Sequence, residues 1–408
     1  MATDGWLSEL AAAAPFADLL AVPDAERRAR GYGDTLREIC QQPLTWPETA
    51  ATMDAAADRV RRALAGGGVP RGGGSLVLTG SGSSFFACEC AAARLQESLA
   101  AIVRAVPAGT ILTHASAVLP AAGPYVVVSL ARSGDSPESA AVVERLLGRE
   151  RVAQLLITCN ADGALARRFR SSDGVESVVL PEATNDRSLV MTSSFTNLVL
   201  AALALAETGD GRRRSGARLA AAARRVLTGR ASEIAAASRR AFSNVVYLGS
   251  GGRLGAAHEA ALKMLESTSG RVVTMSESFL GLRHGPMAAV SKDSLVVAFL
   301  SSDPVVRAYE ADVLLELGRK SLGRWRVVVG DRIPAELSPG AEDVRIDVAD
   351  GTSGETPLED GELTLIDALT GQLLAFFRCL DGGGRPDSPS SGAIRRVVES
   401  FAIHAGRP

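Results

Sequence analysis

The same short pattern occurs twice in this chain of 408 residues, and the repetition limits the folds that it can adopt. SLVLTGSGS at 75–83 and NVVYLGSGG at 244–252 each join an apolar, β-branched run to a glycine-rich turn, and their first glycines are 169 residues apart. At the same spacing, LVVAFLSSD at 295–303 falls on VVVSLARSG at 126–134. Two separated matches at one spacing indicate an internal duplication. The second copy lacks the glycine after its serines, so the two copies are expected to differ in function.

Apolar strands alternate with helical segments along the first copy. Strands are expected at 75–79, 124–130, 152–160 and 176–182, with glycine-containing turns and Ala-rich helices between them. This alternation predicts an α/β fold in which helices cover both faces of a parallel sheet. Residues 1–65 are predicted to be helical, with proline and glycine separating the helices.

The chain is predicted to have four parts, and its length corresponds to about two or three domains. We expect an N-terminal helical arm at 1–50, a first α/β domain at 51–215, a second at 216–380 and a tail at 381–408. The tail regains apolar residues in AIRRVVESFAIHAGRP after the polar linker DGGGRPDSPSSG, so we expect it to dock onto the body of the protein.

The charge pattern argues against a nucleic-acid partner. The formal net charge is -2, and the arginines of residues 210–240 lack interleaved aromatic side chains, so we interpret them as solvated faces of linking helices. We find no apolar run of the ~20 residues needed to cross a membrane. The start, MATDGWLSEL, has no basic segment of a signal peptide. We therefore expect a cytoplasmic protein without a membrane partner.

Cysteine and histidine spacings do not predict a metal site. The C-x-C pair Cys88 and Cys90 differs from zinc and redox motifs, and we interpret the five cysteines as small buried residues. The four histidines show no H-x-x-x-H spacing. Phe85 occupies the sixth position of a G-x-G-x-x-G motif, and no P-loop is present, which disfavours a nucleotide. We expect neither a metal nor a cofactor.

Serines cluster at two strand-to-helix turns. Ser83 and Ser84 follow one predicted strand, and Ser133 and Ser136 follow another. Neighbouring parallel strands would bring both turns to the carboxyl edge of the sheet, where open α/β folds bind ligands. Helix N-termini and hydroxyl donors there suit a phosphate monoester. Simple capping of the helices by serine is the alternative.

A polar stripe runs along the predicted helix at 255–270. Glu259, Lys263 and Glu266 share one face of this otherwise apolar helix. An ion pair between Glu259 and Lys263 would account for two of them. Glu266 would then be left over, which makes it the candidate general base.

His284 precedes Gly-Pro and is therefore expected in a rigid turn outside regular structure. A structural role for this histidine and a role in proton transfer both remain open. The neighbouring Arg283 could contact phosphate or face water.

Six segments taken in order resemble the SIS-domain sugar isomerases: REICQQPLTWPET, LTGSGSS, LARSGDSPES, GSGGRLGAAHEAALKMLE, LRHGP and RPDSPSSGAIRRVVESFAIH. The chain is most similar to the galactosamine-6-phosphate deaminase/isomerase family, also called tagatose-6-phosphate ketose/aldose isomerases. The isomerase half of glucosamine-6-phosphate synthase is a more distant relative. The resemblance implies two tandem SIS domains, each with a flavodoxin-like parallel sheet between helical layers, a helical arm and a docking tail.

The resemblance also implies roles for individual residues. Glu266 would move the proton between C1 and C2, and Lys263 would stand near the open-chain oxygen. His284, from a neighbouring subunit in the distant relative, would assist ring opening. Arg396 and His404 would belong to a tail that closes over the sugar. The implied phosphate and substrate ligands are Gly82, Ser83, Ser84, Arg132, Ser133 and Ser136.

Three departures from the distant relative qualify the resemblance. Ala131 stands where that relative has serine, the tail ends in HAGRP without its catalytic lysine, and residue 2 is not the cysteine of a glutamine-hydrolysing domain. We therefore expect no intrinsic amide transfer from glutamine.

The expected function is aldose/ketose isomerisation of a hexose or hexosamine 6-phosphate, converting galactosamine 6-phosphate to tagatose 6-phosphate and ammonia. Two alternatives remain open, an amino-sugar phosphate isomerase of secondary metabolism and a non-catalytic sugar-phosphate sensor. The expected partners are a small-molecule sugar phosphate and further copies of the chain, in a homodimer or larger homo-oligomer with shared sites.

Overall fold

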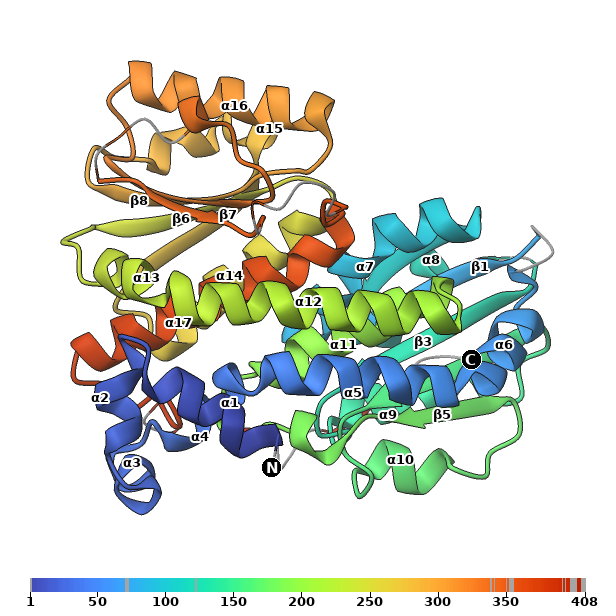
Figure 1. Ribbon diagram of the computed structural model, residues 1–408. Coiled ribbons are helices and arrows are strands. Elements are labelled where there is room, and N and C mark those ends of the chain that lie inside the picture. The colour runs from blue at the N-terminus through green and yellow to red at the C-terminus, as the bar shows by residue number, and fades with distance from the viewer. Residues whose placement is uncertain are drawn as a thin grey trace. The chain divides into compact units, whose positions relative to one another are not determined.

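The computed structural model describes residues 2–69, 73–121, 123–337, 340, 342–349, 351, 356–390, 392, 394–396 and 402–404. It contains two five-stranded parallel sheets flanked by helices (Figure 1), which confirms the predicted α/β fold. The chain falls into two compact units. The first-sheet unit comprises Thr45–Asp186, Ser193–Ala217 and the described residues after Ile394, and the second-sheet unit comprises the rest. The predicted domain boundaries stay a prediction.

The first sheet has the strand order β2-β1-β3-β4-β5. Buried aliphatic runs form its central strands, as the sequence predicted, whereas β2 was not predicted. The bounds are β1 Ser75–Gly80, β2 Ile102–Pro107, β3 Tyr125–Ala131, β4 Val152–Thr158 and β5 Val175–Val179.

The second sheet has the order β10-β9-β8-β6-β7, which is the order of the first sheet counted from the opposite edge. In each sheet the first strand of the unit pairs with the next two strands along the chain. An origin of the two sheets by duplication stays a prediction. The bounds are β6 Asn244–Gly249, β7 Val273–Ser278, β8 Ser294–Phe299, β9 Trp325–Gly330 and β10 Val344–Asp347.

Helix α11, Ser193–Leu203, is buried along its whole length in the first-sheet unit. Its polar side chains bond to α5, Gln42–Ala55, since Trp46 Nε1 donates to Thr196 Oγ1 at 3.0 Å and Thr49 Oγ1 donates to Asn197 Oδ1 at 2.7 Å. These bonds satisfy groups that would otherwise be costly to bury. The other helices are α6 Ala57–Gly66, α7 Ser83–Leu99, α8 Ala108–Val118, α9 Pro137–Leu146, α10 Ala164–Phe169 and α12 Gly209–Gly229, of which only the first part belongs to this unit.

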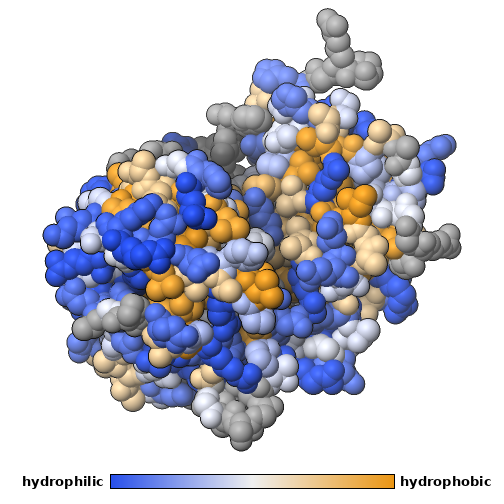
Figure 2. All heavy atoms as spheres, turned by 90° about the horizontal axis from the view of Figure 1, so that it is seen from above, coloured by the Kyte–Doolittle hydropathy of each residue, from blue (hydrophilic) through white to orange (hydrophobic). Residues whose placement is uncertain are grey.

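Helices α14, Gly252–Ser267, and α17, Asp360–Asp381, pack closely in the second-sheet unit (Figure 1). A Cβ added to Gly371 of α17 would lie 2.6 Å from the Ala260 Cβ of α14, so the contact requires glycine. By length and composition α17 could cross a membrane, but 89% of its apolar stretch is buried inside the protein, as in a core helix. Figure 2 shows mainly hydrophilic residues on one face of the molecule, with apolar residues in small groups.

The predicted helical arm forms α1 Ala2–Ala11, α2 Phe16–Ala21, α3 Asp24–Arg30 and α4 Gly33–Cys40. Trp6 Nε1 donates to Cys40 O at 2.7 Å, and the Arg224 guanidinium lies 4.3 Å from the Trp6 ring centre. The start of the predicted tail is bound to α4, because the Asp387 carboxylate accepts hydrogen bonds from Thr35 N and Oγ1 at 2.7 and 2.8 Å. The remaining helices of this unit are α13 Ala231–Ser238, α15 Phe279–Leu282 and α16 Pro304–Arg319.

Candidate functional site

The two serine turns of the first sheet lie at one edge of that sheet. Strands β1 and β3 are hydrogen-bonded neighbours and run parallel, with Thr79 beside Ser129. The turns at 81–84 and 132–136 follow the carboxyl ends of these strands. The structure therefore confirms the predicted pairing of the turns.

Helix α7 begins directly at the first serine pair. Ser83 and Ser84 are its first residues and are buried, and Gly82 before them has φ 56° and ψ −129°. This backbone conformation is easily reached only by glycine. The helix therefore starts abruptly at the sheet edge, and the positive end of its dipole lies there, which favours an anion.

The second turn also places buried polar side chains at this edge. Arg132 and Ser133 are each 9% exposed, and Ser136 precedes the first residue of α9. Neither α7 nor α9 has a side-chain cap, since the residues before them, Gly82 and Ser136, make no capping hydrogen bond. The capping alternative considered for these serines is thus not what the structure shows.

The loop after β4 holds the Arg132–Ser136 turn in place. Asn160 Nδ2 donates to Ser133 O at 2.9 Å, and Ala164 N donates to Asp135 Oδ1 at 2.8 Å. Ser133 Oγ accepts a hydrogen bond from Asp135 N at 3.2 Å, so its hydroxyl also shapes the turn. Sequence reasoning missed Asn160, although an asparagine at a strand end is a usual signal of a turn.

Arg396, in the described part of the predicted tail, contacts this edge. Arg396 Nη2 donates to Asn185 Oδ1 at 2.8 Å, and Asn185 follows β5 and the short 3-10 helix Glu182–Thr184. His404 is exposed. Arg396 is therefore joined to the sheet edge that carries the serine turns, and His404 has no hydrogen bond among the described residues.

The polar stripe of α14 forms a chain of three charges in the second-sheet unit. Lys263 Nζ lies 2.5 Å from Glu266 Oε2 and 3.3 Å from Glu259 Oε1. The side chains of Glu259, Lys263 and Glu266 are 0%, 2% and 19% exposed. The expectation that Glu266 would be left over is wrong, because both carboxylates lie within one helical turn of the lysine and its long stem reaches both.

The turn after α15 carries His284 at the surface. His284 is exposed, its N–H donates to Gly281 O at 2.9 Å, and Gly285 has φ 122°. The predicted rigid turn is confirmed. Arg283 Nε bonds to Glu316 Oε2 at 2.9 Å, so the guanidinium pairs with a carboxylate of α16, a possibility that sequence reasoning did not consider.

The cysteines do not offer a nucleophile. All five are buried and free, as predicted, and burial raises the pKa of Cys40 and Cys159 to about 12. Their thiols therefore stay protonated at neutral pH. Within the described part of the chain, no three His, Cys, Asp or Glu side chains are grouped so that they could hold a metal.

A family model described as SIS domain matches residues 72–207. D-galactosamine-6-phosphate deaminase AgaS of Escherichia coli O157:H7 is 35% identical over 380 residues, which cover 91% of this chain and 95% of that protein. The chain belongs to the AgaS family of SIS-domain proteins. A family member from Streptomyces coelicolor that carries the AgaS name is 37% identical over 377 residues, with 91% and 95% of the two chains covered.

A solved structure supports the same assignment. The crystal structure of tagatose-6-phosphate ketose/aldose isomerase from Escherichia coli has 30% sequence identity and a TM-score of 0.81 to this chain. The match covers 92% of this chain and 97% of the other. The predicted family and the predicted tandem-sheet fold are therefore confirmed.

Proposed function

We propose that the protein is a sugar-phosphate isomerase and deaminase that converts galactosamine 6-phosphate to tagatose 6-phosphate and ammonia. The observation that carries the proposal is the pair of serine turns at one edge of the first sheet, in a member of the AgaS family. Hydroxyls, an arginine and two helix N-termini suit a phosphate monoester, because they supply several donors and one positive charge.

The phosphate of the substrate would be held in the first-sheet unit. Arg132 would supply the positive charge, and the serine hydroxyls and first-turn amides would supply hydrogen bonds. The proposed ligands are Gly82, Ser83, Ser84, Arg132, Ser133 and Ser136, with Arg396 of the tail joined to the same edge through Asn185.

The proton transfers would belong to helix α14. Glu266, the most exposed of the three charged groups, would remove the proton from C2 and return it to C1, a contribution of about 10²–10⁴-fold. Lys263 would stabilise the oxyanion that develops at the open-chain oxygen. The amine on C2 then becomes an imine, and water adds to C2 and releases ammonia, which leaves the ketose 6-phosphate.

Ring opening would be assigned to His284, with His404 as a second candidate. The exposure of His284 in a single chain supports a role in the site of another copy. We accordingly propose a homo-oligomer with shared sites, located in the cytoplasm. Catabolism and a secondary-metabolite pathway would use the same chemistry.

Purified protein incubated with galactosamine, glucosamine and tagatose 6-phosphates tests the proposal when ammonia and ketose are followed. Galactosamine 6-phosphate should yield both products. Glu266→Gln should lower kcat by about 10²–10⁴-fold while the affinity for sugar phosphate is kept. Glu97→Gln, at a position 74% exposed, is the matched control and should be fully active. A Glu266→Gln variant within tenfold of wild type would remove Glu266 as the base.

A further inference from the structure

The carboxyl edge of the second sheet repeats the backbone of the first. Strands β6 and β8 are parallel neighbours, as β1 and β3 are. Gly251, which precedes α14, has φ 55° and ψ −131°, within a few degrees of the values at Gly82. The second sheet therefore presents the same two turns to its carboxyl edge.

The arginine and a serine of these turns have exchanged places between the two copies. At the spacing of 169 residues, Arg253 stands where the first copy has Ser84, and Ser301 stands where it has Arg132. Ser302 corresponds to Ser133. Each edge thus has one buried arginine and several hydroxyls, but the arginine sits on opposite turns.

The serine donors of the second edge bind a carboxylate of the chain itself. Ser301 Oγ donates to Asp360 Oδ2 at 2.5 Å, and Ser302 donates to Asp360 Oδ1 through N at 2.7 Å and through Oγ at 3.1 Å. Ser301 N donates to Glu310 Oε2 at 2.7 Å. The Asp360 carboxylate therefore accepts three hydrogen bonds from the turn that matches the proposed phosphate turn of the first sheet.

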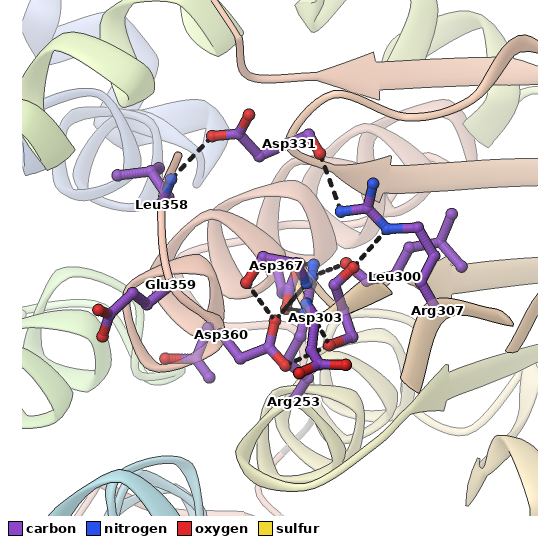
Figure 3. Close-up of polar contacts among 12 residues, drawn as sticks. Arg253, Leu300, Asp303, Arg307, Asp331, Leu358, Glu359, Asp360 and Asp367 are labelled. Carbon is purple, nitrogen blue, oxygen red and sulfur yellow. Dashed lines mark hydrogen bonds and ion pairs between the residues drawn. The ribbon is translucent and has the colours of Figure 1, made fainter. Parts of the chain in front are cut away.

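Arg253 is bound in the same cluster (Figure 3). Its Nε and Nη2 donate to the two oxygens of Asp367 at 2.7 and 2.5 Å, its Nη1 donates to Leu300 O, and that nitrogen lies 4.0 Å from Asp360 Oδ1. The side chains of Arg253 and Asp367 are both 0% exposed. The guanidinium has no face left for an external anion.

The charges of the edge also oppose a second phosphate. Arg253 faces the carboxylates of Asp360, Asp367 and Glu310, and burial raises the pKa of Asp367 to about 7 and raises that of Glu310. Arg307 of α16 also lies at this edge, but its guanidinium donates to main-chain carbonyls, among them Ser301 O. A phosphate dianion added here would bring further negative charge to a site that already holds three carboxylates. Asp360 is the first residue of α17 and its side chain is 34% exposed, so this carboxylate closes the site toward solvent.

We propose that the carboxyl edge of the second sheet is an oxyanion site whose ligand is the chain's own Asp360 carboxylate. The site admits a small external carboxylate only when Asp360 is removed. Each chain then binds a single sugar phosphate, at the first edge. This corollary rests on the proposed function, whereas the proposal that Asp360 occupies the second edge is independent of it.

The occupied site is tested by replacing its ligand with formate. In Asp360→Ala, Ser301 Oγ and both donors of Ser302 lose their acceptor, so the variant should melt below wild type. Sodium formate should raise its Tm by about 3 °C more than sodium chloride of equal concentration does, because formate stabilises the folded state by binding there. Asp312→Ala, an exposed aspartate of α16 in the same unit, is the matched control and should respond as wild type does.

Formate that stabilises Asp360→Ala no more than it stabilises the control overturns the proposal. Asp360→Asn keeps an acceptor in place, so it should be insensitive to formate and provides a second variant if the alanine variant does not fold. Crystals of Asp360→Ala grown in formate should show the ion between Ser301 and Ser302.

Calorimetric titration of the wild-type protein with galactosamine 6-phosphate separates the two proposals. One site per chain is expected. Two binding sites per chain would overturn the proposal that Asp360 occupies the second edge, and the proposed function would be unaffected. No binding would contradict the proposed function, and the formate experiment would still decide the occupancy of the second edge.

Discussion

Replacing Arg253 with methionine removes the cation from the buried pair with Asp367. Methionine has a similar length and keeps the apolar contacts of the stem, so the loss of charge and hydrogen bonds dominates the effect. Leu300 O loses the Arg253 donor in a fully buried position, and Asp367 loses two charged hydrogen bonds. An unpaired buried acceptor costs about 1–3 kcal/mol, and breaking a buried ion pair costs about 3–5 kcal/mol.

The size of the loss should depend on pH. Asp367 has an ordinary pKa of 3.8, and burial raises it to about 7 in the folded protein. In wild type, this group's contribution to stability is complete below pH 3.8, falls as pH rises from there to about 7, and then levels off. Without Arg253 the folded pKa lies higher still, so the variant continues to lose about 1.4 kcal/mol per pH unit above pH 7.

Urea unfolding at pH 6 and pH 9 measures both effects. We expect Arg253→Met to lower the free energy of unfolding by about 3 kcal/mol at pH 6, where Asp367 can take up a proton, and by about 6 kcal/mol at pH 9. The double variant with Asp367→Asn is the control and should show a loss that does not grow with pH. If Arg253→Met lowers the free energy of unfolding by the same amount at both pH values, the ionisation of Asp367 does not depend on Arg253 and the reasoning is refuted.

Two further predictions concern the proposed site. Ser133→Ala should raise KM for the sugar phosphate by about tenfold and leave kcat little changed, since a hydrogen bond to a charged group contributes about 1.5–3 kcal/mol. An equal rise in KM for the unphosphorylated sugar would show that the hydroxyl acts only within the turn. His284→Ala and Glu266→Gln should each be inactive alone but recover about a quarter of the activity when their subunits are mixed and exchanged, because shared sites leave one intact site in each mixed dimer. Mixtures that stay inactive after confirmed exchange would place His284 in the site of its own chain or outside catalysis.

The strands β1, β3, β4, β6 and β8 could be predicted from the sequence because they are runs of buried aliphatic residues. β9 is a run of the same kind inside the second sheet, and it was missed. The edge strands β2, β7 and β10 were not predicted. β2 and β7 carry exposed residues such as Ile102 and Val273, which are 58% and 64% exposed. Their mixed polar and apolar pattern resembles that of a loop. Because the two sheets have the same strand order, an edge strand located in one sheet predicts the corresponding strand in the other.

The charged stripe of α14 was predicted, but its pairing was only half right. Spacing along a helix brings both Glu259 and Glu266 within reach of Lys263. The distances from Lys263 Nζ to the two carboxylates depend on how the lysine side chain packs, which the spacing does not determine. The pair Arg253 and Asp367 was missed altogether, because 114 residues separate its members and no local period joins them. The repeat spacing could have revealed the exchanged arginine, since it aligns Arg253 with Ser84.

Gly82 and Gly251 share one backbone conformation although only the first is proposed to serve a substrate. The conformation is thus demanded by the passage from strand to helix, whatever the turn goes on to hold. In other chains with two such sheets, a G-S-G turn by itself should not be counted as a ligand site. The residue two places after the second glycine is more informative. Its side chain and the group that it contacts distinguish an edge that can bind a ligand from an edge whose polar groups are bound to the protein's own side chains.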